Sequence, residues 1–233
     1  MRIERHKTGA RLIQGGAILS EILARPGPTH SIFDVLAAAV TLHDAAAPRV
    51  AMLGFAGGGM IAPLRALGSA ATIEACDLDA TGFELFEELS SEWRGDVKVD
   101  VADATDWIRN GRSKFDVVIE DLSCLGEDGE ETKPVVSVTN LPPAIQRRLR
   151  QDGLVVTNLL PVPGVSWRSL IRQVAEPWER GVVVEFDEWE NRILLTGPTI
   201  GRASDIGHEL GLRLESLGSE LARRFLTKNF STP

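Results

Sequence analysis

The stretch from Val50 to Asp79 constrains the fold of this chain more than any other part of the sequence. It contains an apolar strand, Val50 to Leu53, then a glycine-rich turn, a helix, and a second strand that ends in Asp77 and Asp79. This order predicts two parallel strands joined by a helix. Glycines at the turn let a ligand approach the backbone, the helix N-terminus offers unpaired N–H groups, and an acidic strand end can accept hydrogen bonds from ribose hydroxyls. The unit therefore predicts a nucleotide site.

Two cofactors are compatible with this turn. Taken as Gly57-x-Gly59-x-x-Ala62, with Asp77 about 20 residues further on, it matches the dinucleotide fingerprint of NAD enzymes. Taken from Gly54, as GFAGGG directly after the strand, it matches the first motif of S-adenosylmethionine (SAM) enzymes. The NAD alternative moves the opening glycine beyond the strand end, so that the tight turn no longer leaves the sheet directly. We therefore favour SAM; the structural alternative is that the glycines only let helix and strand pack closely.

Length and composition narrow the class of protein. A chain of 233 residues with 43% apolar and 25% charged residues can bury one large core. The net charge of −8 argues against nonspecific nucleic-acid binding. Neither a signal or transit pattern nor a run near the ~20 apolar residues of a membrane span is present, so we expect a cytoplasmic protein without a membrane partner. Cys76 and Cys124 are too few for a paired cysteine metal cluster, and we expect no metal.

The rest of the chain predicts an α/β fold with a mostly parallel sheet. Residues 1–28 read as a small N-terminal β-hairpin region, and residues 29–233 as one Rossmann-like domain with helices on both faces. Further strands are expected at Val97 to Val101, Phe115 to Ile119, Leu154 to Leu160, Val182 to Phe186 and Arg192 to Thr196, the last two as an antiparallel hairpin. Further helices are expected at Ser31 to about His43, Ala80 to about Glu92, from near Asp103, from Asn140, at Ser166 to about Trp178, and near Leu217 to Phe230.

The longest polar loop, Leu122 to about Val138, follows the apolar strand that ends in Glu120 and Asp121. It carries the acids Glu127, Asp128, Glu130 and Glu131. Such a run is usually a solvated loop; the sharper interpretation is a lid that selects a cationic substrate.

Seven strands with a reversed final hairpin, a glycine turn after the first and acidic tips on the second and fourth, resemble the class I SAM-dependent methyltransferase fold. Within it the chain looks most similar to spermidine synthases. Those enzymes carry GGGDGG where this chain has GFAGGG, and a CEID-like strand end where it has CDLD. They carry GDG or GDA where it has ADA from Ala102 to Ala104, and DSSDP where it has DLSCL from Asp121 to Leu125.

The resemblance implies roles for residues at three strand ends. Asp77 would bind the ribose, Asp103 would meet the adenine amino group, and Asp121 would be the catalytic acid facing the reacting amine. The implied cofactor-binding positions are Gly54, Ala56, Gly57, Gly58, Asp77, Leu78, Asp103 and Ala104. From the residues alone, Asp103 is equally a helix N-cap, and Asp121 is alternatively a solvent-facing strand end.

The chain differs from the polyamine synthases at three positions whose side chains hold the polyamine in those enzymes. The Asp of GGGDGG is Gly57, the second Asp of DSSDP is Cys124, and a Tyr before the first strand falls near Ile32. Because Gly57 has no carboxylate, the carboxylate of intact SAM is not repelled there. The aminopropyl ammonium of decarboxylated SAM likewise loses an attraction.

We therefore expect a SAM-dependent methyltransferase on a spermidine-synthase-like scaffold, acting on N or O of a small molecule. Asp121 would orient the acceptor or take its proton. The alternatives are polyamine aminopropyl transfer from decarboxylated SAM and a noncatalytic SAM- or nucleoside-binding module. An NAD-dependent reductase is disfavoured because no Tyr or His stands in a suitable setting. The sequence leaves homodimer formation open.

Overall fold

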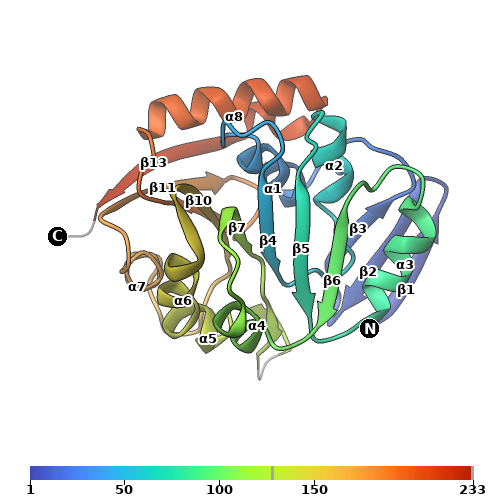
Figure 1. The fold of residues 1–233 in the computed structure, drawn as a ribbon, viewed down its shortest axis with the longest axis horizontal. Coiled ribbons are helices and arrows are strands. Elements are labelled where there is room, and N and C mark those ends of the chain that lie inside the picture. The colour runs from blue at the N-terminus through green and yellow to red at the C-terminus, as the bar shows by residue number, and fades with distance from the viewer. Residues whose placement is uncertain (127–128, 232–233) are drawn as a thin grey trace.

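The computed structural model describes residues 1–126 and 129–231, and a large sheet forms its centre (Figure 1). Its strands are β4 Arg49–Leu53, β5 Thr72–Asp77, β6 Val97–Val101, β7 Phe115–Glu120, β10 Leu149–Leu159, β11 Arg180–Phe186, β12 Arg192–Thr196 and β13 Phe225–Ser231. They lie in the order β13-β11-β12-β10-β7-β4-β5-β6. The strands from β10 to β6 run parallel, whereas β12, β11 and β13 pair antiparallel. The predicted class is confirmed, with eight described strands in this sheet rather than seven.

Helices cover both faces of the sheet because its strands alternate between two cores. Val50 and Met52 of β4 face a core shared with α1 Ile32–Val40, α2 Ile61–Ala66, α3 Thr81–Ser90 and α8 Ala203–Leu217. The alternate residues, Ala51 and Leu53, face a core shared with α4 Ala104–Asn110 and α6 Leu141–Arg148. A third cluster joins α7 Trp167–Val174 to the antiparallel strands.

The N-terminal region is a three-stranded antiparallel sheet of β1 Arg2–His6, β2 Gly9–Gln14 and β3 Ala17–Leu23. The predicted hairpin region therefore has one strand more than a hairpin. Leu12 and Ile22 lie in the main core, and Arg5 makes a two-bond ion pair with Glu88 of α3 at 2.7 and 2.8 Å. These contacts place the small sheet against the glycine turn.

The predicted C-terminal helix at Leu217 to Phe230 is wrong. The helix there is α8, which ends at Leu217 and is followed by Gly218 at φ 74°, and the chain then returns as strand β13 beside β11. Two glycines inside α8 weaken its sequence signal. One of them, Gly207, is needed for close packing, because a Cβ there would lie 2.6 Å from Thr227 Oγ1 of β13.

The predicted polar loop after β7 contains short regular elements. Strands β8 Cys124–Leu125 and β9 Glu131–Thr132 pair with each other, and the helix α5 Val135–Thr139 follows. Glu127 and Asp128 lie outside the described residues. Among the described helices, none combines the length and apolar character that crossing a bilayer would require.

Candidate functional site

Gly54, directly after β4, brings two strand ends together. It adopts φ 86°, which favours glycine, and a Cβ on it would lie 2.6 Å from the carbonyl oxygen of Asp121. Asp121 N donates to Leu53 O at 2.9 Å. The glycine therefore lets the chain leaving β7 pass against the turn that leaves β4.

The next three glycines of the turn are packing positions. A Cβ on Gly57 would lie 2.4 Å from Ile22 Cδ1, one on Gly58 would meet the Phe55 ring at 2.5 Å, and one on Gly59 would meet Phe33 at 2.9 Å. Apolar side chains of the N-terminal sheet, Ile22 and Leu12, therefore fill the space that a side chain at Gly57 would need. The N-terminus of α2 is likewise buried behind the turn, where Ile61 is 0% exposed.

Phe55 and Ala56 form the part of the turn that Asp77 holds. Phe55 is buried in edge-to-face contact with Phe83 and Phe86 of α3. Ala56 has φ 46°, a strained conformation for a residue with a Cβ. Asp77 Oδ2 accepts from the backbone N–H groups of both residues, at 2.9 and 2.7 Å. The acid at the tip of β5 thus fixes the turn at the tip of β4.

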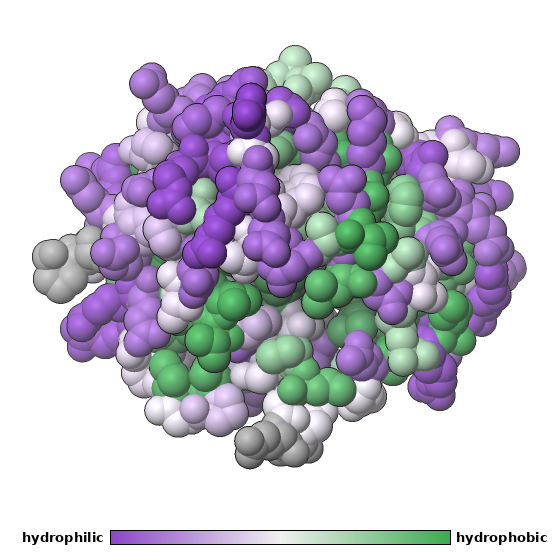
Figure 2. Space-filling model, turned by 60° about the horizontal axis from the view of Figure 1, so that its bottom comes forward, coloured by the Kyte–Doolittle hydropathy of each residue, from purple (hydrophilic) through white to green (hydrophobic). Residues whose placement is uncertain are grey.

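A cavity of about 1040 Å³ lies at the carboxyl ends of the parallel strands. Figure 2, which brings this edge forward, shows apolar side chains around a hollowed part of the surface. Five predicted site residues line the cavity: Gly54, Ala56, Asp77, Leu78 and Asp121. The predicted residues Gly57, Gly58, Asp103 and Ala104 do not. The structure therefore gathers the ends of β4, β5 and β7 around one space.

Asp121 is half-buried at one wall of this cavity. Its Oδ1 accepts from Asn158 Nδ2 at 2.7 Å, and Asn158 Oδ1 accepts from Asn191 Nδ2 at 3.0 Å. Burial raises the pKa of Asp121 from 3.8 to about 6, an effect that the Asn158 hydrogen bond and the charge of Lys133 partly offset. Such a carboxylate takes a proton more readily than an ordinary aspartate at neutral pH.

A buried ion pair lies directly beside Asp121. Lys133 Nζ is 2.8 Å from Glu120 Oε2 and donates to Leu122 O at 2.9 Å. Ser137 Oγ donates to the other Glu120 oxygen at 2.9 Å. The charge of Glu120 is therefore compensated, and the segment after β7 is tied back to the strand end.

The ends of β5 and β6 lie side by side, since Ala102 N donates to Asp77 O at 2.8 Å. Asp103 accepts from Thr105 N and Asp106 N, so it is the N-cap of α4, the structural role that the sequence had left open. Two apolar side chains stand exposed at these strand ends, Leu78 at 74% and Val101 at 65%. Leu78 lies in the wall of the cavity, whereas Val101 does not line it.

Acidic side chains predominate in the cavity wall. They are Glu21, Asp77, Asp79, Asp121 and Glu131. The basic residues of the wall are Arg11 and His30, and Arg11 is paired with Glu21. Of the acids predicted for a lid, Glu131 lies in the wall, and burial raises its pKa.

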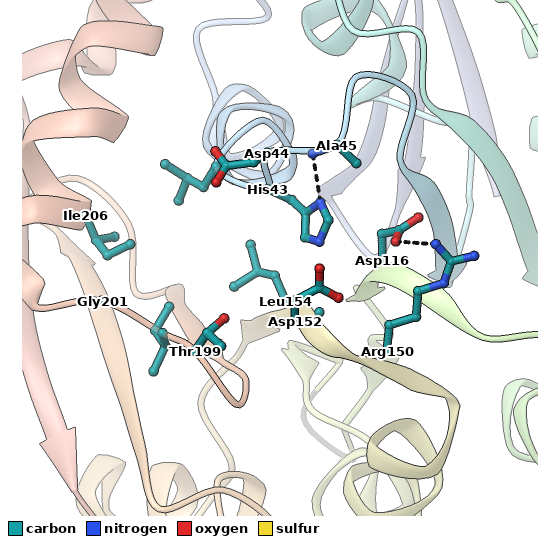
Figure 3. A pocket seen from close by; sticks show the side chains of 13 residues that line it. His43, Asp44, Ala45, Asp116, Arg150, Asp152, Leu154, Thr199, Gly201 and Ile206 are labelled. Carbon is teal, nitrogen blue, oxygen red and sulfur yellow. Dashed lines mark hydrogen bonds and ion pairs between the residues drawn. The ribbon is translucent and has the colours of Figure 1, made fainter.

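A second cavity, of about 610 Å³, lies at the opposite edge of the sheet (Figure 3). His43 points into it, and Asp116 at its wall is paired with Arg150 at 2.7 Å. None of the predicted cofactor or catalytic residues lines it.

Sequence reasoning missed several residues of the main cavity, above all Asn158, Asn191 and Trp189. Asn158 had a usable signal, since it is a lone amide in the apolar run LVVTNLL. Asn191 and Lys133 had no such signal in the sequence, because their partners, Asn158 and Glu120, are distant in the chain.

Comparisons with known proteins find solved structures that resemble this one. No protein-family model and no curated protein matches this sequence. A probable spermidine synthase from Corynebacterium glutamicum superposes with a TM-score of 0.72 and 21% identity, over 96% of this chain and 86% of that one.

Two further crystal structures contain adenosyl ligands. Human methyltransferase-like protein 13 in complex with SAH gives a TM-score of 0.61 at 18% identity, over 82% of this chain and 92% of that one. A spermidine synthase in complex with the transition-state analogue AdoDATO gives 0.61 at 14% identity, over 85% of this chain and 68% of that one. The chain therefore has the fold of spermidine synthases and class I SAM-dependent methyltransferases.

Proposed function

We propose that this protein is a SAM-dependent methyltransferase acting on a nitrogen or oxygen of a small molecule. The observation that carries the proposal is the convergence of Gly54, Ala56, Asp77 and Asp121 on one cavity at the carboxyl edge of the sheet. Open α/β sheets bind ligands at this edge. The volume of about 1040 Å³ is at the upper end of typical small-molecule sites, so it has room for a cofactor and an acceptor together.

The residues present fit an adenosyl cofactor. Asp77 Oδ1 accepts one hydrogen bond, from Asp79 N at 3.1 Å, and has lone pairs left for ribose hydroxyls. The exposed Leu78, in the cavity wall, offers apolar surface for an adenine ring. SAM, when bound, supplies an electrophilic methyl group on a sulfonium.

Asp121 would act on the acceptor. Its carboxylate would accept a hydrogen bond from the N–H or O–H of the acceptor and orient the lone pair for in-line attack on the methyl carbon. The methyl group would pass from the sulfur of the cofactor to the acceptor, leaving a thioether, and the acceptor would lose its proton to Asp121. The raised pKa of Asp121 supports this role.

Methyl transfer is favoured over aminopropyl transfer by the cavity wall. Ile32 and Cys124 both line it, at the positions where the resemblance places a Tyr and an Asp that hold a polyamine. At the third such position, Gly57 packs against Ile22. Aminopropyl transfer from decarboxylated SAM is retained as the second candidate, because the acidic wall also suits a cationic donor or acceptor.

Calorimetric titration of the full chain with SAM, decarboxylated SAM, methylthioadenosine and NAD tests the proposal. SAM is expected to bind at least as tightly as decarboxylated SAM, and NAD is expected not to bind. A tenfold preference for decarboxylated SAM would make aminopropyl transfer the better reading, and tight NAD binding would overturn the cofactor assignment. Mass-spectrometric detection of S-adenosylhomocysteine with a panel of amines and phenols then distinguishes an enzyme from a noncatalytic binding module.

A further inference from the structure

Three polar side chains from separate segments form a chain of hydrogen bonds at the cavity. Asn158 lies near the end of β10, is 6% exposed, and donates to Asp121. Asn191 lies just before β12 and donates to Asn158. All three line the cavity.

We propose that Asn158, held by Asn191, is a positioning residue for the Asp121 carboxylate. It binds Asp121 Oδ1 and so leaves Oδ2 directed at the substrate that accepts the methyl group. This inference rests on the proposed function of the cavity. Among the described residues, the hydrogen bond to the Asp121 carboxylate comes from Asn158.

The direction of each bond follows from amide chemistry. An amide oxygen accepts and an amide nitrogen donates, so an Asn191 N–H on Asn158 Oδ1 turns Asn158 Nδ2 toward Asp121. Asn158 lies within the paired part of β10, opposite Ile193 of β12, so its backbone is fixed by the sheet. The orientation of Asn158 therefore comes from its place in β10 and from the amide of Asn191, the residue before β12.

The surrounding charges give this amide a distinct role. The charged groups that act on Asp121 are Lys133, Glu120 and Glu131. Lys133 is committed to Glu120 and to Leu122 O, so it acts on Asp121 as a neighbouring charge and not as a direct donor. A neutral amide stabilises the carboxylate less than a direct ammonium partner would, and so leaves Asp121 able to accept a proton.

The pKa of Asp121, measured by carboxyl ¹³C NMR, tests the proposal without an acceptor. The resonance is assigned with Asp121→Asn, and wild type is compared with Asn158→Ala and Asn191→Ala. Loss of the amide donor is expected to raise the pKa of Asp121 by about one pH unit in Asn158→Ala, with a smaller rise in Asn191→Ala. SAM affinity by calorimetry is expected to stay within about twofold in both variants.

An unchanged pKa in a folded Asn158→Ala protein would overturn the proposal, and so would loss of SAM binding, which would place Asn158 in the cofactor shell. Asn191 is half-buried and acts through Asn158, so Asn191→Ala gives the same test if Asn158→Ala does not fold. A wild-type protein that binds no SAM, yet shows the expected pKa changes, would remove the proposed function and keep the hydrogen-bonded chain that holds Asp121.

Discussion

The Lys133 ammonium lies 2.8 Å from the Glu120 carboxylate, and the two side chains are 0% and 1% exposed. Glu120 ends β7, and Lys133 follows β9. The pair therefore closes the segment between them into a loop whose first residue is Asp121. A carboxylate left alone in this position would be both buried and charged, which is costly.

Lys133→Met is expected to lower the free energy of unfolding by about 3–5 kcal/mol, because Glu120 loses its buried partner. Denaturant unfolding at neutral pH measures the loss. Arg5→Met serves as the control, since its pair with Glu88 is exposed to solvent and should contribute far less to stability than the buried pair. Adding Glu120→Gln to Lys133→Met should recover most of the stability. Equal losses in Lys133→Met and Arg5→Met would contradict the assignment.

Asp77→Ala is expected to weaken SAM binding by about 1–3 kcal/mol, roughly 5- to 150-fold, because ribose hydroxyls and the N–H groups of Ala56 and Phe55 lose their acceptor. Calorimetry of the folded variant gives the change. Asp152→Ala, an exposed acid at the second cavity, is the matched control and should bind SAM as wild type does. Unaltered affinity in Asp77→Ala would show that the acid only holds the turn.

Asp121→Asn is expected to leave SAM affinity nearly unchanged and to lower turnover by about 10²–10⁴-fold, the range for a general base. The variant keeps the size of the side chain and an oxygen that can accept from Asn158, and it removes the charge. Release of S-adenosylhomocysteine with an acceptor found by screening provides the rate. Normal turnover would mean that Asp121 is a strand end only, and lost SAM binding would move it to the cofactor shell.

The raised pKa of Asp121 also predicts a pH dependence of stability. Between about pH 4 and the folded pKa of about 6, the folded protein keeps a proton that the unfolded chain has lost. The contribution of this group to the free energy of unfolding therefore falls as the pH rises through that window. At about pH 8, Asp121→Asn should be more stable than wild type by roughly 1–2 kcal/mol. This difference is smaller than the full pKa shift implies, because the side chain is half-buried. Near pH 4 the variant and the wild type should be equally stable. Urea unfolding across this range measures both values, and a constant difference would rule out the pKa assignment.

The sequence predicted which strands form the sheet and which acidic residues end them. Val50 to Leu53 and Phe115 to Ile119 are apolar runs covered on both faces, and the expected strands at both places are confirmed. Carboxyl ends of neighbouring parallel strands meet at one edge, and the structure places Gly54, Asp77 and Asp121 around one cavity there, whereas Asp103 caps α4 outside it.

Contacts between distant segments could not be read in the same way. The packing of Gly57 depends on Ile22, and the strand at Phe225 depends on β11 as a pairing partner. Asn158 and Lys133 acquire their importance from Asp121 and Glu120, residues that a local pattern does not connect to them.

The sequence by itself therefore determined the fold class and the sheet edge at which the strand-end acids gather, because apolar periodicity and strand-end residues are local and repeat within a few positions. The tertiary structure alone decided which glycines face the cavity, which acid caps a helix, and which amide holds Asp121. Each of these depends on a partner many residues away, whose position is set only when the whole core packs.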